Sequence, residues 1–227
     1  MNTPQYPSYE EAAATGDTKK MAHYVVDTVS AFADGAHVQF DFLDVAAVGS
    51  FCASLKIRRN WAALSLDEIA PPDADGWNVV PAGEADHILG LLAALIRDGY
   101  LDPRNNGKPV PTLLNDFMTR PAQFKGERTL GHTAEFAYAL AVELEHGRDR
   151  GQNVTMNHPL LTGMVVLAHL TEDTLYYARL RVMETEGDLF NQQLTRTPYA
   201  DLRDTLKRLQ KAQSLLAARM AEKLEAA

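Results

Sequence analysis

The sequence predicts an all-α fold: a multi-helix bundle with a long C-terminal helix and an N-terminal arm. Apolar residues recur every three to four positions in at least six segments, the spacing of one face of an α-helix. Hydrophobic residues make up 46% of the 227 residues, which is enough to bury a sizeable core. Any strand is expected to be confined to about residues 37–42 or 77–81.

The N-terminal part is expected to consist of an arm and a helical lobe. Residues 1–16 are polar and turn-prone and carry Pro4 and Pro7, so we expect them to pack on another chain or run extended across their own domain. The helical lobe then covers residues 17–102. Its expected helices run from Asp17 towards Gly35, through most of 42–57, and over 84–98, with a long loop at 67–83.

The C-terminal part is expected to be a second helical lobe, residues 132–227, joined to the first by a connecting segment at 103–131. Its helices are predicted over residues 132–146, 159–170 and 173–186, the last ending at Gly187, with a long final helix from Thr197 and Pro198. Along that final helix the apolar residues keep a near-heptad seam that contains the polar Gln213: Leu202, Leu206, Leu209, Leu216 and Met220.

Composition excludes several classes of protein. The formal net charge is -8, so the chain is not expected to bind nucleic acid, although it can bind a basic patch on another protein. No segment is long and apolar enough for a membrane span, and the N-terminus lacks the pattern of a signal peptide. We therefore expect a cytoplasmic protein, or one within a virion that is assembled in a cytoplasm.

The sequence contains no complete catalytic motif, so the prediction is that the protein is not an enzyme. It has no Gly-x-Ser-x-Gly and no glycine-rich phosphate loop with its lysine. The single cysteine, Cys52, lies in an apolar run, which favours a buried, inert thiol and excludes an intrachain disulfide.

One set of polar residues leaves a metal site open as an alternative. Glu143 and His146 lie one turn apart on a predicted helix, the half-motif of ferritin-like di-iron bundles. The possible metal ligands, for iron or another divalent metal, are Glu135, Glu143, His146, His169, Glu172 and Glu184.

The competing interpretation of these residues is structural. Only one Glu-x-x-His repeat is present, whereas a di-iron bundle uses two. His146 and His169 each fall in the last turn of a predicted helix, where a histidine can bind the unpaired carbonyl groups, and Glu143 can hold the other ring nitrogen of His146. We favour this hydrogen-bond network, with no cofactor, over a bound metal.

The region 132–187 carries a set of spaced motifs: Glu-Leu-Glu-His-Gly at 143–147, Asn-Val-Thr at 153–155, a proline-started helix ending Ala-His-Leu-x-Glu, and a helix with Tyr176-Tyr177 and Met183-Glu184. In these motifs the region resembles domain-of-unknown-function family 5661, whose members occur in bacteria and tailed phages. The chain departs from the family pattern at His158, where an acidic residue is expected, and at Met164, near which a basic one is expected. The resemblance implies a small helical fold and no reaction.

Two functions follow from these observations. The first is a non-enzymatic structural or assembly protein that acts through protein–protein contacts, as a homo-oligomer or in a larger assembly such as a phage virion. The alternative is a ferritin-like metal-binding protein with an oxidase or storage role. The sequence favours the first because it contains no complete metal or catalytic motif.

Overall fold

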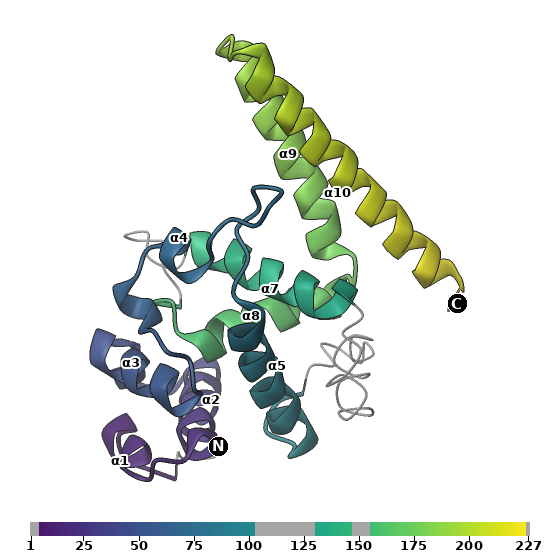
Figure 1. The fold of residues 1–227 in the computed structure, drawn as a ribbon. Helices are drawn as coiled ribbons and strands as arrows, with labels where there is room; N and C mark the ends of the chain where they lie inside the picture. The colour runs from purple at the N-terminus through teal and green to yellow at the C-terminus, as the bar shows by residue number, and fades with distance from the viewer. Residues whose placement is uncertain (1–4, 103–129, 147–154, 226–227) are drawn as a thin grey trace. The chain divides into compact units, whose positions relative to one another are not determined.

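The computed structural model describes residues 5–102, 130–146 and 155–225, whose regular secondary structure is helical (Figure 1). Extended pairing in them is limited to one isolated bridge between Pro72 and Asn78, and they form no sheet. This confirms the predicted all-α fold with its long C-terminal helix. Of the two segments in which a strand was allowed, neither forms one.

The chain divides into two compact units, residues Met1–Thr171 and Glu172–Ala227. We call them unit 1 and unit 2 and describe each by itself. The sequence predicted a division at 103–131, and most of that segment lies outside the described residues. The boundary at Thr171 instead places the last two helices in a unit of their own, because they pack mainly on each other.

Unit 1 contains seven α-helices in its described part and two short 3-10 turns. The bounds of the α-helices are α1 Tyr9–Ala14, α2 Thr18–Ala33, α3 Val45–Ser54, α4 Leu66–Ile69, α5 Ala82–Arg97, α7 Leu130–Glu145 and α8 Pro159–Glu172, whose last residue opens unit 2. The 3-10 turns are η1 Asp41–Leu43 and η2 Trp61–Ala63. The α2, α5, α7 and α8 spans are close to the predicted helices.

Helix α1 makes the predicted N-terminal arm, in its second half, an internal part of unit 1. Ser8 caps the helix and Tyr9 is buried. The backbone N–H of Tyr9 donates to Asp41 at 2.7 Å, and the Tyr24 hydroxyl donates to the same carboxylate at 3.0 Å. Residues 9–14 are therefore neither extended nor dependent on another chain for their contacts, because Asp41 and the aromatic core hold them.

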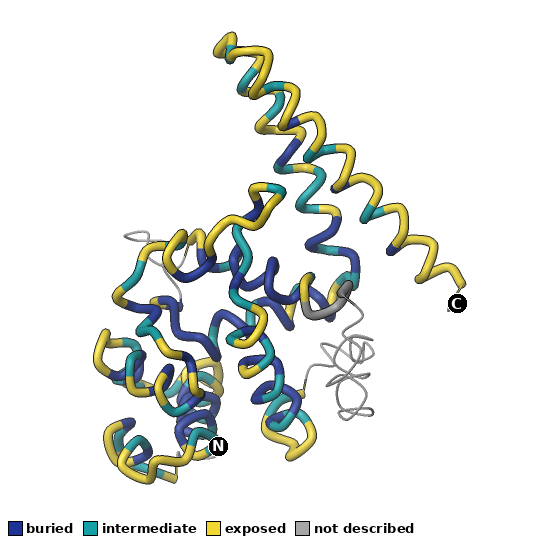
Figure 2. The backbone as a smooth tube through the Cα atoms, viewed as in Figure 1, coloured by how far each residue is buried: buried dark blue, intermediate teal, exposed yellow. Residues whose placement is uncertain are grey.

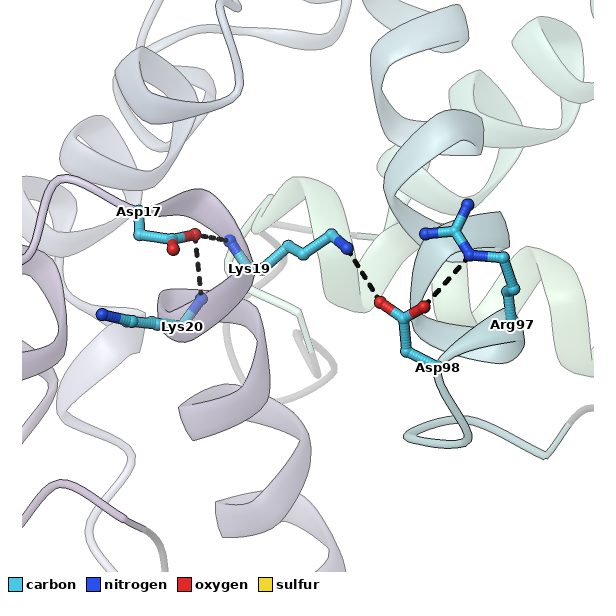
Figure 3. Close-up of polar contacts among 5 residues, drawn as sticks. All are labelled: Asp17, Lys19, Lys20, Arg97 and Asp98. Carbon is cyan, nitrogen blue, oxygen red and sulfur yellow. Dashed lines mark hydrogen bonds and ion pairs between the residues drawn. The ribbon is translucent and has the colours of Figure 1, made fainter.

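Polar contacts fix the start of α2 and tie it to the end of α5 (Figure 3). The side chain of Asp17 accepts from the backbone N–H of Lys19 at 2.9 Å, as an N-cap does. The ammonium group of Lys19 then lies 2.8 Å from the carboxylate of Asp98, which also accepts from Arg97 at 3.1 Å. These contacts are exposed and hold two helix ends together at the surface.

The segment expected as a loop at 67–83 begins with the short helix α4 and is held in place by half-buried polar groups. The indole N–H of Trp61, a fully buried residue, donates to Glu84 at 3.0 Å. Arg59 lies 3.4 Å from the same carboxylate and donates to the carbonyl of Ile69 at 3.1 Å. One carboxylate in the first turn of α5 thus organises the chain between α3 and α5.

The core of unit 1 lies where α5, α7 and α8 meet. These helices carry many of the buried positions of unit 1, which are drawn in dark blue in Figure 2. Gly163 is buried in α8, and a Cβ atom placed there would lie 2.9 Å from Ile88 and 3.0 Å from Leu92 of α5. The absence of a side chain at this position therefore sets how closely α8 approaches α5.

Unit 2 is a helical hairpin of two long helices, α9 Tyr176–Leu194 and α10 Tyr199–Glu225, which run side by side in opposite directions (Figure 1). The turn between them contains Arg196 at a φ of 55°. The sequence predicted that the first of these helices ends at Gly187, and this was wrong. Gly187 is exposed and lies inside α9, which continues to Leu194. A single glycine weakens a helix but does not end it when the residues on either side are helical.

Candidate interaction surface on the helical hairpin

The two helices of the hairpin meet along a seam of small side chains. Ala178 and Thr185 of α9 are buried and lie seven residues apart. On α10 the buried positions are also seven apart: Thr205, Ala212 and Arg219. A spacing of seven residues keeps one face turned towards a neighbouring helix, as in a left-handed coiled coil, and small residues let the two backbones approach.

An ionic contact closes the open end of the hairpin. Asp173, just before α9, lies 3.1 Å from Arg179 and 3.6 Å from Lys223 near the end of α10. Next to it in the seam, the guanidinium of Arg219 reaches Glu222 at 2.8 Å. The ion pair between Asp173 and Lys223 therefore joins the start of α9 to the end of α10.

The opposite face of α9 is apolar and exposed. Met183, Phe190 and Leu194 are 62%, 59% and 66% exposed. Successive helical residues are about 100° apart, so spacings of seven and four keep these three on one face. That face points away from Thr185, which follows Met183 by two residues and lies in the seam. We call these three residues, with the half-buried Tyr176 and Leu180 that continue the same face, the α9 stripe.

Helix α10 also exposes apolar side chains, at its edge beside the seam. Leu206 and Met220 of the predicted heptad seam are 44% and 43% exposed, whereas its other members, Leu202, Leu209 and Leu216, are half-buried. The contact with α9 runs along a different face of α10, through the buried residues Thr205, Ala212 and Arg219.

Charge separates the two units. The hairpin unit, residues 172–227, carries nine acidic and nine basic residues and is neutral. The remaining 21 acidic and 13 basic residues lie in residues 1–171, so that unit carries the whole formal charge of -8. Two copies of the hairpin can therefore approach each other without net repulsion, which two copies of unit 1 cannot.

The structure brings two of the six predicted metal ligands together. Glu143 of α7 lies 3.7 Å from Nε2 of His169 in α8. His146, which the sequence paired with Glu143, is exposed beyond the end of α7, and Glu143 turns to the neighbouring helix instead. Glu135 is elsewhere on α7, and Glu172 and Glu184 belong to unit 2.

Within the described residues, no group of three or more His, Cys, Asp or Glu side chains is close enough to hold a metal ion. What Glu143 and His169 form is a pair between two helices. This contact joins α7 to α8, whereas the structural interpretation placed Glu143 beside His146 on the same helix.

A buried polar cluster that the sequence did not reveal lies at the start of α8. His158 is fully buried, with the ring of Phe51 at 4.5 Å and that of Phe42 at 5.8 Å between ring centres. Neither ring nitrogen has a hydrogen-bond partner among the described residues. Burial lowers the pKa of His158 to about 3, so the imidazole is neutral at ordinary pH.

Asn157, the residue before His158, is also buried and is held in an unusual backbone conformation. Asn157 is buried with a φ of 56°, and its amide donates to the carbonyl of Trp61 at 3.3 Å. Asparagine accepts the left-handed conformation more readily than most residues. Pro159 at the first position of α8 marks where the helix begins, but it does not predict that the two residues before it are buried.

Two further observations bear on the predicted classes. Cys52 is 1% exposed, and burial raises the pKa of its thiol to about 11, in keeping with an inert core residue. Among the described residues, none of the helices combines the length and the apolar character needed to cross a membrane.

Comparison with known proteins yields one family. Residues 114–186 match the family described as a protein of unknown function, DUF5661. The match includes α7, α8 and the first part of α9, among them the motifs from Glu143 to Glu184. It confirms the resemblance that those motifs predicted. No curated protein and no solved structure matches the chain.

Proposed function

We propose that this protein is a non-enzymatic assembly protein that acts through protein–protein contacts, and that the hairpin of unit 2 provides the contact surface. The observation that carries the proposal is the α9 stripe, an apolar face that lies opposite the seam with α10. Large apolar side chains that gather on one exposed face mark a site for another protein, whereas scattered ones need no explanation.

The distribution of exposed apolar side chains supports this choice. Eleven large hydrophobic residues are exposed in the described part of the chain, and seven of them lie on the hairpin. They are Met183, Phe190, Leu194, Tyr199, Leu206, Met220 and Leu224. Unit 1 places its large side chains inside, with Trp61, Phe42 and Phe51 fully buried, so the contact surface is assigned to the hairpin.

The finer proposal is that the assembly is a phage virion or a precursor of one, formed in a cytoplasm. Its support is the match to a family with members in bacteria and tailed phages, together with a chain in which no complete catalytic motif occurs. A virion component needs surfaces for contact with neighbouring chains, and the exposed apolar α9 stripe supports such a role.

Sedimentation of extracts from the native source tests the proposal. We expect the chain to sediment with other proteins in particles well above its own 25.0 kDa, and the double variant Met183→Glu/Phe190→Glu to leave those particles. The matched control is Leu224→Glu, since Leu224 is 77% exposed on the same hairpin but lies outside the α9 stripe. A native chain that sediments alone at 25.0 kDa would contradict the proposal.

The ferritin-like alternative has its own test. Elemental analysis of protein purified without chelators, for the wild type and His169→Ala, measures iron, zinc and manganese per chain. We expect both proteins to remain at background, because Glu143 and His169 supply two ligand groups and a stable site uses about four or more. Near one equivalent of metal in the wild type, lost in the variant, would establish the alternative instead.

A further inference from the structure

We infer that the α9 stripe binds the same stripe of a second copy of this chain, with the two α9 helices parallel and related by a two-fold axis. This inference rests on the proposed function and names the partner of the same surface. It is argued from the spacing of the stripe, the position of α10 and the charges beside the stripe.

The spacing of the stripe is that of a coiled-coil seam. From the start to the end of α9 the residues of this face are separated alternately by four and three positions: Tyr176, Leu180, Met183, Gly187, Phe190 and Leu194. This alternation defines the a and d positions of a heptad and continues over the whole helix. A straight seam of this kind fits another helix lying nearly parallel to it, rather than a strand or a flat surface.

Helix α10 packs on the other side of α9 from this face. Helix α10 packs against α9 through Thr185 and its neighbours, and the stripe lies on the far side of α9. A second α9 can therefore dock without displacing α10, giving a layer of four helices with the two α9 helices at the centre. A helix at the centre of such a layer contacts a neighbour on each side. In α9 one side is the seam through Ala178 and Thr185, and the other is the α9 stripe.

The charges beside the stripe select the orientation. One flank carries Arg179 and Glu186 and the other carries Glu184 and Asn191. In a parallel pair each g position faces the e position five residues later in the partner, so Arg179 meets Glu184 and Glu186 meets Asn191. An antiparallel pair centred on Thr185 would instead place Glu186 against Glu186 and Glu184 against Glu184.

The contacts that these residues already make do not prevent this pairing. Arg179 lies 3.1 Å from Asp173 in its own chain, and it is 58% exposed. Exposed ion pairs contribute little and exchange partners readily. The hairpin as a whole is neutral, so its approach to a second hairpin meets no long-range repulsion, in contrast to the approach of the acidic unit 1.

Light scattering of the purified full-length chain tests the pairing. We expect a mass of twice 25.0 kDa for the wild type and for Leu224→Glu. In Met183→Glu/Phe190→Glu two carboxylates enter an apolar seam from each chain, so the dimer should weaken by at least about 30-fold. Circular dichroism confirms that the variants keep their helix content. A wild type that remains a monomer at about 0.2 mM, or a double variant that remains a dimer, overturns the inference.

A cysteine introduced at the end of the stripe tests the orientation. In a parallel two-fold pair Leu194 faces Leu194 of the second copy, so Leu194→Cys should form a dimer-linking disulfide under mild oxidation. The native Cys52 is buried and does not interfere. Leu224→Cys is the control and should stay unlinked. A Leu194→Cys dimer that does not cross-link, or links only with Tyr176→Cys, would show an antiparallel pair and overturn the inference.

The two proposals fail in different ways. If the purified chain is a monomer but sediments in large particles in native extracts, the self-pairing is wrong and the assembly function stands. If the chain sediments alone in extracts, the assembly function is wrong, whatever the purified protein does. The two measurements use the same double variant and the same Leu224→Glu control, so their results can be compared directly.

Discussion

The two units of this chain differ in where they place their large apolar side chains. Unit 1 buries Trp61, Phe42 and Phe51 completely and leaves charge on its surface. The hairpin buries Tyr177 at the start of α9, but farther along its seam it buries small side chains such as Thr185 and exposes large apolar ones such as Phe190. The difference indicates that unit 1 is stabilised by a core of large side chains, whereas the hairpin exposes apolar surface that a partner can bury.

The largest expected effect comes from the same substitution made in both units. Phe51→Ala removes a fully buried ring from unit 1 and should lower the free energy of unfolding by about 3–5 kcal/mol. Phe190→Ala removes a ring that is 59% exposed and should leave the unfolding of unit 1 nearly unchanged. Urea denaturation followed by circular dichroism and fluorescence measures both. Equal losses from the two substitutions would remove the contrast between the units.

The second prediction sharpens the contrast with two glycines. Gly163→Ala places a methyl group 2.9 Å from Ile88 and 3.0 Å from Leu92, so we expect a loss of about 1–3 kcal/mol from overpacking between α8 and α5. Gly83→Ala is the control within the same unit, since a Cβ there meets nothing within 4 Å. A Gly163→Ala protein as stable as the Gly83→Ala protein would mean that α8 can move away from α5 without cost.

The helices of both units could be predicted from sequence more readily than their contacts. Met21, Tyr24 and Val25 are buried on one face of α2, because a three-to-four spacing of large apolar residues encodes a core-facing stripe. The sequence marked a heptad of large apolar residues on the last helix, among them Leu206 and Met220, but gave no indication that this helix contacts α9 through Thr205 and its repeats. Small residues contribute weakly to a hydrophobic pattern, although they decide how closely two helices can pack.

The contacts of the polar residues were also harder to predict from the sequence than the helices that carry them. The sequence indicated Glu143, His146 and His169 as neighbours along the helices, but the contact between Glu143 and His169 depends on how α7 packs against α8. The burial of His158 depends on Phe42 and Phe51, which lie more than 100 residues earlier. Contacts of this range follow from tertiary packing, and one sequence carries no direct signal for them.

The third prediction concerns the pH dependence of unit 1. Burial lowers the pKa of His158 to about 3, whereas in the unfolded chain it is about 6.5, so the unfolded state gains a proton first as the pH falls. Stability is therefore complete above pH ~6.5 and declines below it, by about 1.4 kcal/mol between pH 7.5 and 5.5. Urea denaturation at these two pH values measures the loss. His158→Gln, which cannot titrate, should lose most of this difference, and an unchanged slope in that variant would contradict the assignment.

The smallest expected effect lies in the hairpin and has the opposite sign. Gly187 occupies an exposed position inside α9, and a Cβ there meets nothing within 4 Å. Alanine restricts the unfolded chain more than glycine does, so Gly187→Ala should stabilise α9 by about 0.5–1 kcal/mol. Hydrogen exchange of the α9 amides should then slow by about 2- to 5-fold, measured in the Met183→Glu/Phe190→Glu background to keep association out of the result. If exchange is unchanged, the helix around Gly187 does not open locally, and the hairpin is more stable by itself than its small seam implies.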